Sequence, residues 1–231
     1  MPASADDYRV LSTEELISLA RGIEQRGRPH GDPDWGAVVA LHERSTPEVL
    51  AAAQSLCKAA DPIERRVGCL ILGEFGHDGI RPIGQQDRPY RDEILGALHA
   101  LLEGHEDPSV VRAAASAVSW WSDPRSVEWL LALTGHQDAS VRYAVADALT
   151  RTVPDWTRPD ERVLAALLEF TRDESAHVRY SAVFGVASVI TEASAVGDVA
   201  EVREALVQAL ADPDDGVRES ARKGLEGLQP S

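Results

Sequence analysis

The chain has 231 residues, 44% of them hydrophobic and 26% charged, which fits a folded soluble protein and is too apolar for a disordered one. Its 38 acidic side chains outnumber its 23 basic ones, and the net charge of −15 disfavours binding to nucleic acid or an anionic membrane surface. No apolar run is long enough to span a membrane, and the polar first ten residues do not resemble an export signal, so we expect a cytoplasmic protein with neutral or basic partners.

Two amphipathic segments come first, at 12–25 and 34–45. Ser12 and Glu15 have the spacing of a capping box at the start of the first segment. We predict a helix in each segment. Together they would form an N-terminal helical cap over residues 1–46 that covers the apolar face of the first repeat.

From residue 47 to residue 228 a two-helix unit repeats five times. The first helix of each pair (helix A) is predicted at 47–60, 91–104, 125–135, 158–172 and 199–211, and the second (helix B) at 61–76, 107–121, 138–151, 173–189 and 212–228. Apolar residues recur at spacings of three and four, the period of a helix. The matching apolar positions near the end of helix B, which are Leu72, Val118, Leu149, Val186 and Leu225, lie 46, 31, 37 and 39 residues apart. The pattern predicts a single continuous repeat domain over 47–228, followed by a tail at 229–231.

The helix B copies begin with similar residues. Asp occurs at or just before the start, as at Asp107, Asp138 and Asp212, where a carboxylate can accept hydrogen bonds from unpaired backbone N–H groups. In three copies a proline follows, at a position where its missing N–H costs nothing. A Val-Arg pair comes next in several copies, and we expect its arginine to reach the Asp of the neighbouring repeat, forming a ladder of charge-assisted hydrogen bonds.

This order is clearest from Asp138 to Leu149, where Val-Arg is followed by alanines and a leucine at helical spacing. It resembles the short HEAT repeats also found in phycobilin lyase subunits, and the resemblance covers about residues 47–228. It implies an all-α fold, an α-solenoid (α-α superhelix) of about five HEAT-like helix pairs plus the N-terminal cap, with the B helices lining the concave face. Protein binding is the function that it implies, because the repeated residues build a scaffold rather than a site.

The Val-Arg register also predicts which face of helix B meets solvent. The core should take the Val and the positions three, six and seven after the Arg, and the opposite face the positions one, five and eight or nine after it. That face carries the candidate binding residues Arg112, Trp120, Tyr143, Asp147, Arg151, Tyr180 and Phe184. Exposed aromatic side chains are typical anchors of protein recognition, although these rings could instead pack against adjacent helices. We assign Trp121 and Trp129 to the core.

Other chemistry-bearing residues carry no recognisable site. Cys57 and Cys69 lie in apolar helical stretches and are predicted to be buried, reduced thiols. His105 and His136 occupy matching turns and are interpreted as turn residues rather than ligands, so we predict no metal and no cofactor. The Gly- and Pro-rich insert at 76–92, which carries Arg81, Arg88 and Arg91, is either functional or loosely ordered, and both alternatives stay open.

No common catalytic or nucleotide-binding motif is present. We therefore predict a non-catalytic scaffold or adaptor that binds a protein or peptide segment. Two enzymatic alternatives remain. One is an alkyl-base DNA glycosylase of the HEAT-like kind, which would need a basic cleft that the net charge disfavours. The other is a chromophore lyase or isomerase subunit, suggested by the repeat resemblance.

Overall fold

The computed structural model describes residues 8–27, 31–77, 88–104, 107–152, 160–193 and 200–226. Those residues form helices and no strand, which confirms the all-α prediction. The backbone groups into two compact units, an N-terminal unit (Met1–Trp121) and a C-terminal unit (Ser122–Ser231). Residues 229–231, predicted to be a tail, lie outside the described residues.

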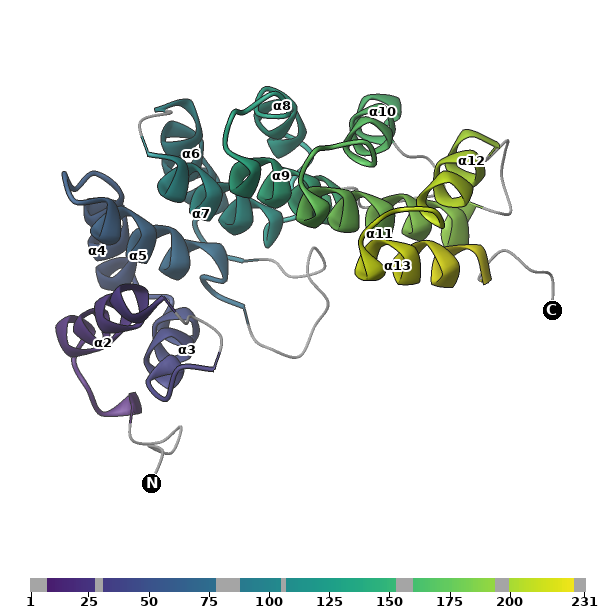
Figure 1. The fold of residues 1–231 in the computed structure, drawn as a ribbon. Coiled ribbons are helices and arrows are strands. Elements are labelled where there is room, and N and C mark those ends of the chain that lie inside the picture. The colour runs from purple at the N-terminus through teal and green to yellow at the C-terminus, as the bar shows by residue number, and fades with distance from the viewer. Residues whose placement is uncertain are drawn as a thin grey trace. The chain divides into compact units, whose positions relative to one another are not determined.

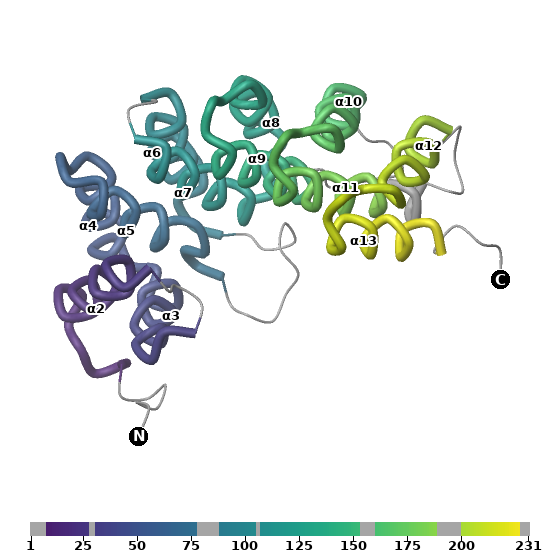
Figure 2. Tube along the Cα trace, viewed as in Figure 1, coloured from purple at the N-terminus to yellow at the C-terminus, as the bar shows by residue number. Residues whose placement is uncertain are grey.

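The N-terminal unit contains six of the helices (Figures 1 and 2). They are α2 (Thr13–Arg26), α3 (Trp35–Arg44), α4 (Pro47–Cys57), α5 (Pro62–Gly73), α6 (Arg91–Glu103) and α7 (Pro108–Ser119). The A helices are α4 and α6, and the B helices are α5 and α7. The two B helices pack against each other. The two helices predicted as a cap, α2 and α3, pack together and both contact α5.

The C-terminal unit holds the remaining three pairs. They are α8 (Ser126–Leu131) with α9 (Ala139–Thr152), α10 (Glu161–Phe170) with α11 (Ala176–Ala193), and α12 (Ala200–Ala209) with α13 (Asp215–Glu226). Within this unit the A helices form one layer and the B helices another (Figure 1). The middle B helix, α11, packs against both α9 and α13, so stacked helix pairs build the solenoid arrangement that the repeats predict.

Helix starts follow the predicted chemistry. Ser12 and Glu15 form the capping box of α2, with the Ser12 N–H donating to Glu15 Oε2 at 2.8 Å. Asp61 and Asp107 are the N-caps of α5 and α7, and each precedes a proline in the first turn. The Asp107 carboxylate accepts a hydrogen bond from the Ser109 N–H at 2.8 Å.

The predicted arginine ladder is present in the C-terminal unit. Arg142 on α9 donates from Nε and Nη2 to the Asp173 carboxylate at 2.7 and 3.0 Å. One repeat further on, Arg179 on α11 makes the same two bonds to Asp212, at 2.7 and 2.9 Å. The Nη1 atom of each arginine donates to carbonyl oxygens of the turn that precedes its own helix. Each arginine thereby joins its own turn to the turn of the next repeat.

The structure corrects the register of the acidic residues. Sequence alignment places Asp138 and Asp212 at one repeated position, but they differ by two places when the arginines are superposed. His136, Asp173 and Asp212 all lie six residues before the Val-Arg arginine, and each accepts a hydrogen bond from the backbone N–H two residues later. Asp138 and Asp214 instead lie directly before α9 and α13 and cap them. Gaps of different length between the Asp and the Val-Arg hide this difference in the sequence.

Core positions agree with the predicted helix register. Val141, Val145, Ala148 and Leu149 are fully buried on α9. Trp121 is also buried, as predicted, and its Nε1–H donates to the Leu72 carbonyl at 3.0 Å. The core assignment of Trp129 is wrong, because this indole is only half-buried on the short helix α8. A large ring needs cover from neighbouring helices, and around Trp129 this cover is partial.

Arg88 is buried, and it is the first described residue after the gap at 78–87. Its guanidinium donates to the carbonyl oxygens of Gly73, Phe75 and Trp120, at 2.7, 3.1 and 2.8 Å. It also stacks over the indole of Trp121, 3.5 Å from the ring centroid. The residue thus fastens the end of the insert to the C-terminal ends of α5 and α7. Arg81 lies outside the described residues.

Candidate functional site

Three aromatic side chains project into solvent from the B helices of the C-terminal unit. Tyr143 on α9 is 40% exposed, and Tyr180 and Phe184 on α11 are 45% and 57% exposed. The two α11 residues are one helical turn apart, so their side chains lie on the same face. Core valines fill the opposite side of both helices, which leaves these rings as the apolar part of the solvent-facing surface.

Asp147 and Arg151 lie on the same face of α9, one and two turns beyond Tyr143. The Arg151 Nε donates to Asp147 Oδ2 at 3.0 Å. Both side chains are partly exposed, so this pair contributes little to stability and stays accessible to another molecule. The face of α9 therefore combines an aromatic ring with a charged pair.

A groove of about 400 Å³ runs between α11 and α13. Tyr180 and Phe184 line one side, and Glu219 and Lys223 line the other. The remaining lining residues are small, among them Ala187, Gly216 and Gly224. Gly224 allows the two helices to approach closely, because a Cβ there would lie 2.6 Å from the Cβ of Ala187. The groove therefore has aromatic residues on one side, charged residues on the other and small residues between them.

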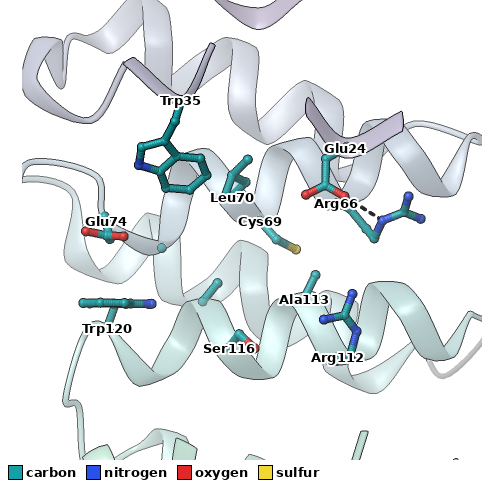
Figure 3. Close-up of a pocket in the computed structure, with 12 residues that line it drawn as sticks. Glu24, Trp35, Arg66, Cys69, Leu70, Glu74, Arg112, Ala113, Ser116 and Trp120 are labelled. Carbon is teal, nitrogen blue, oxygen red and sulfur yellow. Dashed lines mark hydrogen bonds and ion pairs between the residues drawn. The ribbon is translucent and has the colours of Figure 1, made fainter. Parts of the chain in front are cut away.

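Arg112 and Trp120, the other two predicted residues, line a different cleft. It lies within the N-terminal unit, measures about 220 Å³, and is bounded by α2, α3, α5 and α7. Figure 3 shows the indoles of Trp35 and Trp120 at the same end of this cleft as the carboxylate of Glu74, with Arg112 towards the other end. Trp35 and Trp120 come from α3 and from the end of α7, whereas Glu74 directly follows α5.

The two ends of the cleft differ in the charged side chains that line them. Arg66 donates to Glu24 Oε2 at 2.9 Å and to the Ser109 hydroxyl oxygen at 3.0 Å, so one guanidinium is already neutralised at the Arg112 end. Glu74 at the aromatic end is half-buried. The negative charge of Glu74 favours the charged form of Arg88, which itself is not part of the cleft lining.

Cys69 faces this cleft but is only 1% exposed. A hydrogen bond with Cys57 and burial both raise the pKa of the Cys69 thiol well above its ordinary value. A thiol with a raised pKa carries little of the reactive thiolate at neutral pH. Neither cysteine forms a disulfide and both are buried, as predicted. Cys69 therefore forms part of the cleft wall and is not suited to act as a nucleophile.

The seven predicted residues therefore fall into separate sets. Arg112 and Trp120 share the N-terminal cleft, Tyr180 and Phe184 share the α11–α13 groove, and Tyr143, Asp147 and Arg151 share the exposed face of α9. Sequence reasoning missed Trp35 and Glu74, which belong to a helix assigned to the cap and to the irregular end of α5. A tryptophan at the second position of the amphipathic segment 34–45 was the available signal for Trp35.

His136 has a structural role, since its Nδ1 accepts the Asp138 backbone N–H at 3.0 Å. His105 lies outside the described residues. Within the part of the chain that is described, no three His, Cys, Asp or Glu side chains gather in a metal-binding group. The described helices also include none that is long and apolar enough to cross a membrane.

The family model for HEAT repeats matches residues 58–150, 94–187 and 127–226, three overlapping spans that take in both units. The chain belongs to the HEAT-repeat family. No curated protein matches this HEAT-repeat chain.

Several solved structures share the fold. YibA of E. coli is 19% identical with a TM-score of 0.70, covering 97% of this chain and 76% of YibA. The CpcE and CpcF complex of phycocyanin lyase from Nostoc sp. PCC7120 gives 16% identity and a TM-score of 0.55, covering 78% of this chain and 99% of the matched one. A designed armadillo repeat protein in complex with the peptide (KR)4 gives 13% identity and a TM-score of 0.51, covering 95% of this chain and 100% of the designed one. At these identities the likeness shows the fold alone.

Proposed function

We propose that this protein is a non-catalytic scaffold or adaptor that binds a protein segment on the solvent-facing side of its B helices. The observation that carries the proposal is the exposure of Tyr143, Tyr180 and Phe184 on two B helices that pack side by side. Large exposed aromatic rings provide most of the binding energy in protein interfaces, because they bury a large area with little loss of conformational entropy.

Charge supports a neutral or basic partner. The net charge of −15 attracts basic segments and repels phosphate backbones. Among the structural relatives, the designed armadillo protein holds the basic peptide (KR)4, and CpcE is in complex with CpcF. Both examples are consistent with a helical-repeat surface that recognises another polypeptide.

The ionisable residues with shifted pKa values support a scaffold rather than an enzyme. A hydrogen bond from Arg179 lowers the pKa of Asp212, and hydrogen bonds from Ser109 and Ser140 lower the pKa values of Asp107 and Asp138. Each shift has its cause in a helix cap or a ladder rung. Helix capping and a structural ion pair therefore account for the shifts of these three carboxylates without a catalytic role.

The proposal is tested by replacing Tyr143 and Tyr180 together with Ala. Both side chains are exposed, so the double variant should keep its helical content and its unfolding midpoint. In affinity capture from native cell lysate, we expect the partner retained by the wild type to be lost, with a decrease in affinity of tenfold or more, since each anchor is worth about 1 kcal/mol or more. The matched control replaces Val207 on the A helix α12 and Leu210 directly after it with Ala, because both side chains are exposed. Unchanged capture by the folded tyrosine variant would contradict the proposal.

A further inference from the structure

The exposed tyrosines on α9 and α11 occupy equivalent positions in two neighbouring repeats. On each helix the tyrosine directly follows the ladder arginine, and both arginines make matching bonds to the turn of the next repeat. Because α9 and α11 pack against each other, Tyr143 and Tyr180 lie on neighbouring helices, whose axes are usually about 8–10 Å apart when helices pack. The two rings therefore form a row that runs across the B helices.

A third ring lies beside this row. Phe184 is one helical turn beyond Tyr180 on α11, and both side chains line the same side of the α11–α13 groove. The ring of Tyr180 lies beside Gly216 at the start of α13, since a Cβ on that glycine would be 3.5 Å from Tyr180 Cδ2. A ligand on α11 thus meets two rings, and a ligand that extends to α9 meets a third.

The charged side chains beside the rings are paired with one another. On α9, Asp147 forms an ion pair with Arg151, with 3.0 Å between Oδ2 and Nε. On α13, Glu219 pairs with Lys223, with 3.5 Å between Oε1 and Nζ, and also with Arg222. The surface around the rings therefore carries charges of both signs that balance each other, although the whole chain has a net charge of −15. This local balance favours an uncharged ligand.

We propose that this face binds a proline-rich segment of a partner protein in the polyproline II conformation. The inference rests on the proposed function, because it names the kind of segment that the same tyrosines hold. A polyproline II chain rises about 3.1 Å per residue and completes a turn in three, so prolines three positions apart lie about 9 Å apart on one side of the chain. That repeat matches the spacing of packed helices. Successive prolines therefore stack on Tyr143 and Tyr180, and the segment crosses the B helices.

Proline-rich segments also suit the chemistry of the rings. The face of an aromatic ring has negative potential and packs against the C–H groups of a proline ring. A polyproline II chain has no internal hydrogen bonds, so its carbonyl oxygens can accept from the hydroxyl groups of the exposed Tyr143 and Tyr180. The segment is already extended before it binds, and little conformational entropy is lost. Aromatic-lined grooves recognise proline-rich chains in this way.

The test titrates the full chain with three synthetic peptides. The first, acetyl-Ser-Pro-Ala-Ala-Pro-Ala-Ala-Pro-Ser-amide, has prolines three positions apart. The second, acetyl-Ser-Pro-Ala-Pro-Ala-Pro-Ala-Ala-Ser-amide, has the same composition but never that spacing. The third replaces the prolines of the first peptide with arginine. NMR follows the isotope-labelled tyrosine rings of the chain, which has 4 tyrosines, and Tyr8 and Tyr90 in the N-terminal unit serve as internal controls.

We expect the first peptide to shift only the signals of Tyr143 and Tyr180 and to bind about fivefold or more tightly than the second. The variant Y143A leaves one tyrosine in the row and should bind both proline peptides equally, whereas Y143F keeps the ring and should keep the preference. The matched control V207A shortens an exposed side chain on α12 and should bind like the wild type. Unchanged signals of Tyr8 and Tyr90 show that each variant is folded.

Equal affinity for the two proline peptides, no shift at millimolar peptide, or the same loss in Y143F as in Y143A would each overturn the inference. Tighter binding of the arginine peptide would overturn the choice of an uncharged segment. Failure of the proposed function is distinguishable, since the capture experiment asks only whether Tyr143 and Tyr180 retain a partner. Capture that is lost in the tyrosine double variant, together with no preference between the two proline peptides, would reject only the polyproline II segment.

Discussion

His42 is buried between α3 and α5, and its Nε2 lies 2.9 Å from the Leu70 carbonyl oxygen. Burial lowers the pKa of His42 from 6.5 to about 4, because the charged imidazolium would lose its hydration there. Between those two pH values the unfolded chain takes up a proton that the folded chain does not. Above pH 6.5 the neutral His42 therefore does not lower the free energy of unfolding. As the pH is lowered from 6.5 towards 4, the free energy of unfolding should fall by up to ~3 kcal/mol.

Urea unfolding at pH 7, 6, 5 and 4.5 measures this loss. The variant H42Q can still donate to the Leu70 carbonyl but does not titrate, so it should flatten the profile in this window. The control H177Q changes an exposed histidine and should keep the wild-type slope. Carboxylates such as Asp212, whose pKa is lowered, begin to lose their contribution below about pH 5, so the difference between H42Q and the wild type isolates the contribution of His42. A profile for H42Q that matches the wild type would refute the assignment.

At the scale of the element, the acidic residues before the B helices of the C-terminal unit occupy two positions with different functions. Asp138 caps α9 and accepts the Ser140 N–H at 2.7 Å. Asp173 accepts the Ser175 N–H and also receives two hydrogen bonds from Arg142, whose side chain is 10% exposed. One position stabilises its own helix, and the other joins two repeats.

The same substitution at both positions should separate these functions. Asn is as good an N-cap as Asp, so D138N should change the free energy of unfolding by less than about 0.5 kcal/mol. D173N should cost about 3 kcal/mol, because it removes the charge-assisted hydrogen bonds of the mostly buried Arg142 and leaves only the exposed carboxylate of Glu174 to balance its charge. Chemical denaturation of the two variants at pH 7 measures the difference. Equal stabilities would show that the ladder contributes nothing beyond capping.

Most of the elements could be predicted from the sequence, because periodic apolar residues and helix-start signals coincide in nearly every copy. The prediction of α5 and α7 at Asp-Pro is an example, and the structure confirms both starts. The two-place offset between Asp138 and Asp212 could not be predicted, since the number of residues between the Asp and the Val-Arg varies. Trp129 was misplaced because an apolar sequence context does not reveal how much of a large ring the neighbouring helices cover.

At the scale of the whole molecule, the acidic excess argues against a nucleic-acid-binding enzyme. A duplex-binding cleft needs several phosphate contacts, and a net charge of −15 opposes them at long range. We expect no retention of duplex DNA in a mobility-shift assay at about 50 mM salt, where electrostatic binding is strongest. Binding of duplex DNA that weakens steeply with added salt would support the DNA glycosylase alternative.

The candidate binding residues were only partly predictable at this scale. Helix register places Tyr143, Tyr180 and Phe184 on the solvent side from sequence alone, and their exposure agrees. Their role in binding stays a prediction. The N-terminal cleft brings Trp35, Glu74 and Trp120 together from three helices far apart in the chain, and no spacing rule within one repeat can indicate such a meeting.

The arginine ladder also has a consequence for synthesis on the ribosome. Arg142 and Arg179 take their acceptors from residues 31 and 33 positions later in the chain. At a translation rate of about 5–20 residues per second, each arginine therefore emerges some seconds before its carboxylate exists. During that interval the leading edge of the nascent solenoid carries an uncompensated cation, which keeps that edge hydrated and disfavours premature apolar association until the next repeat arrives.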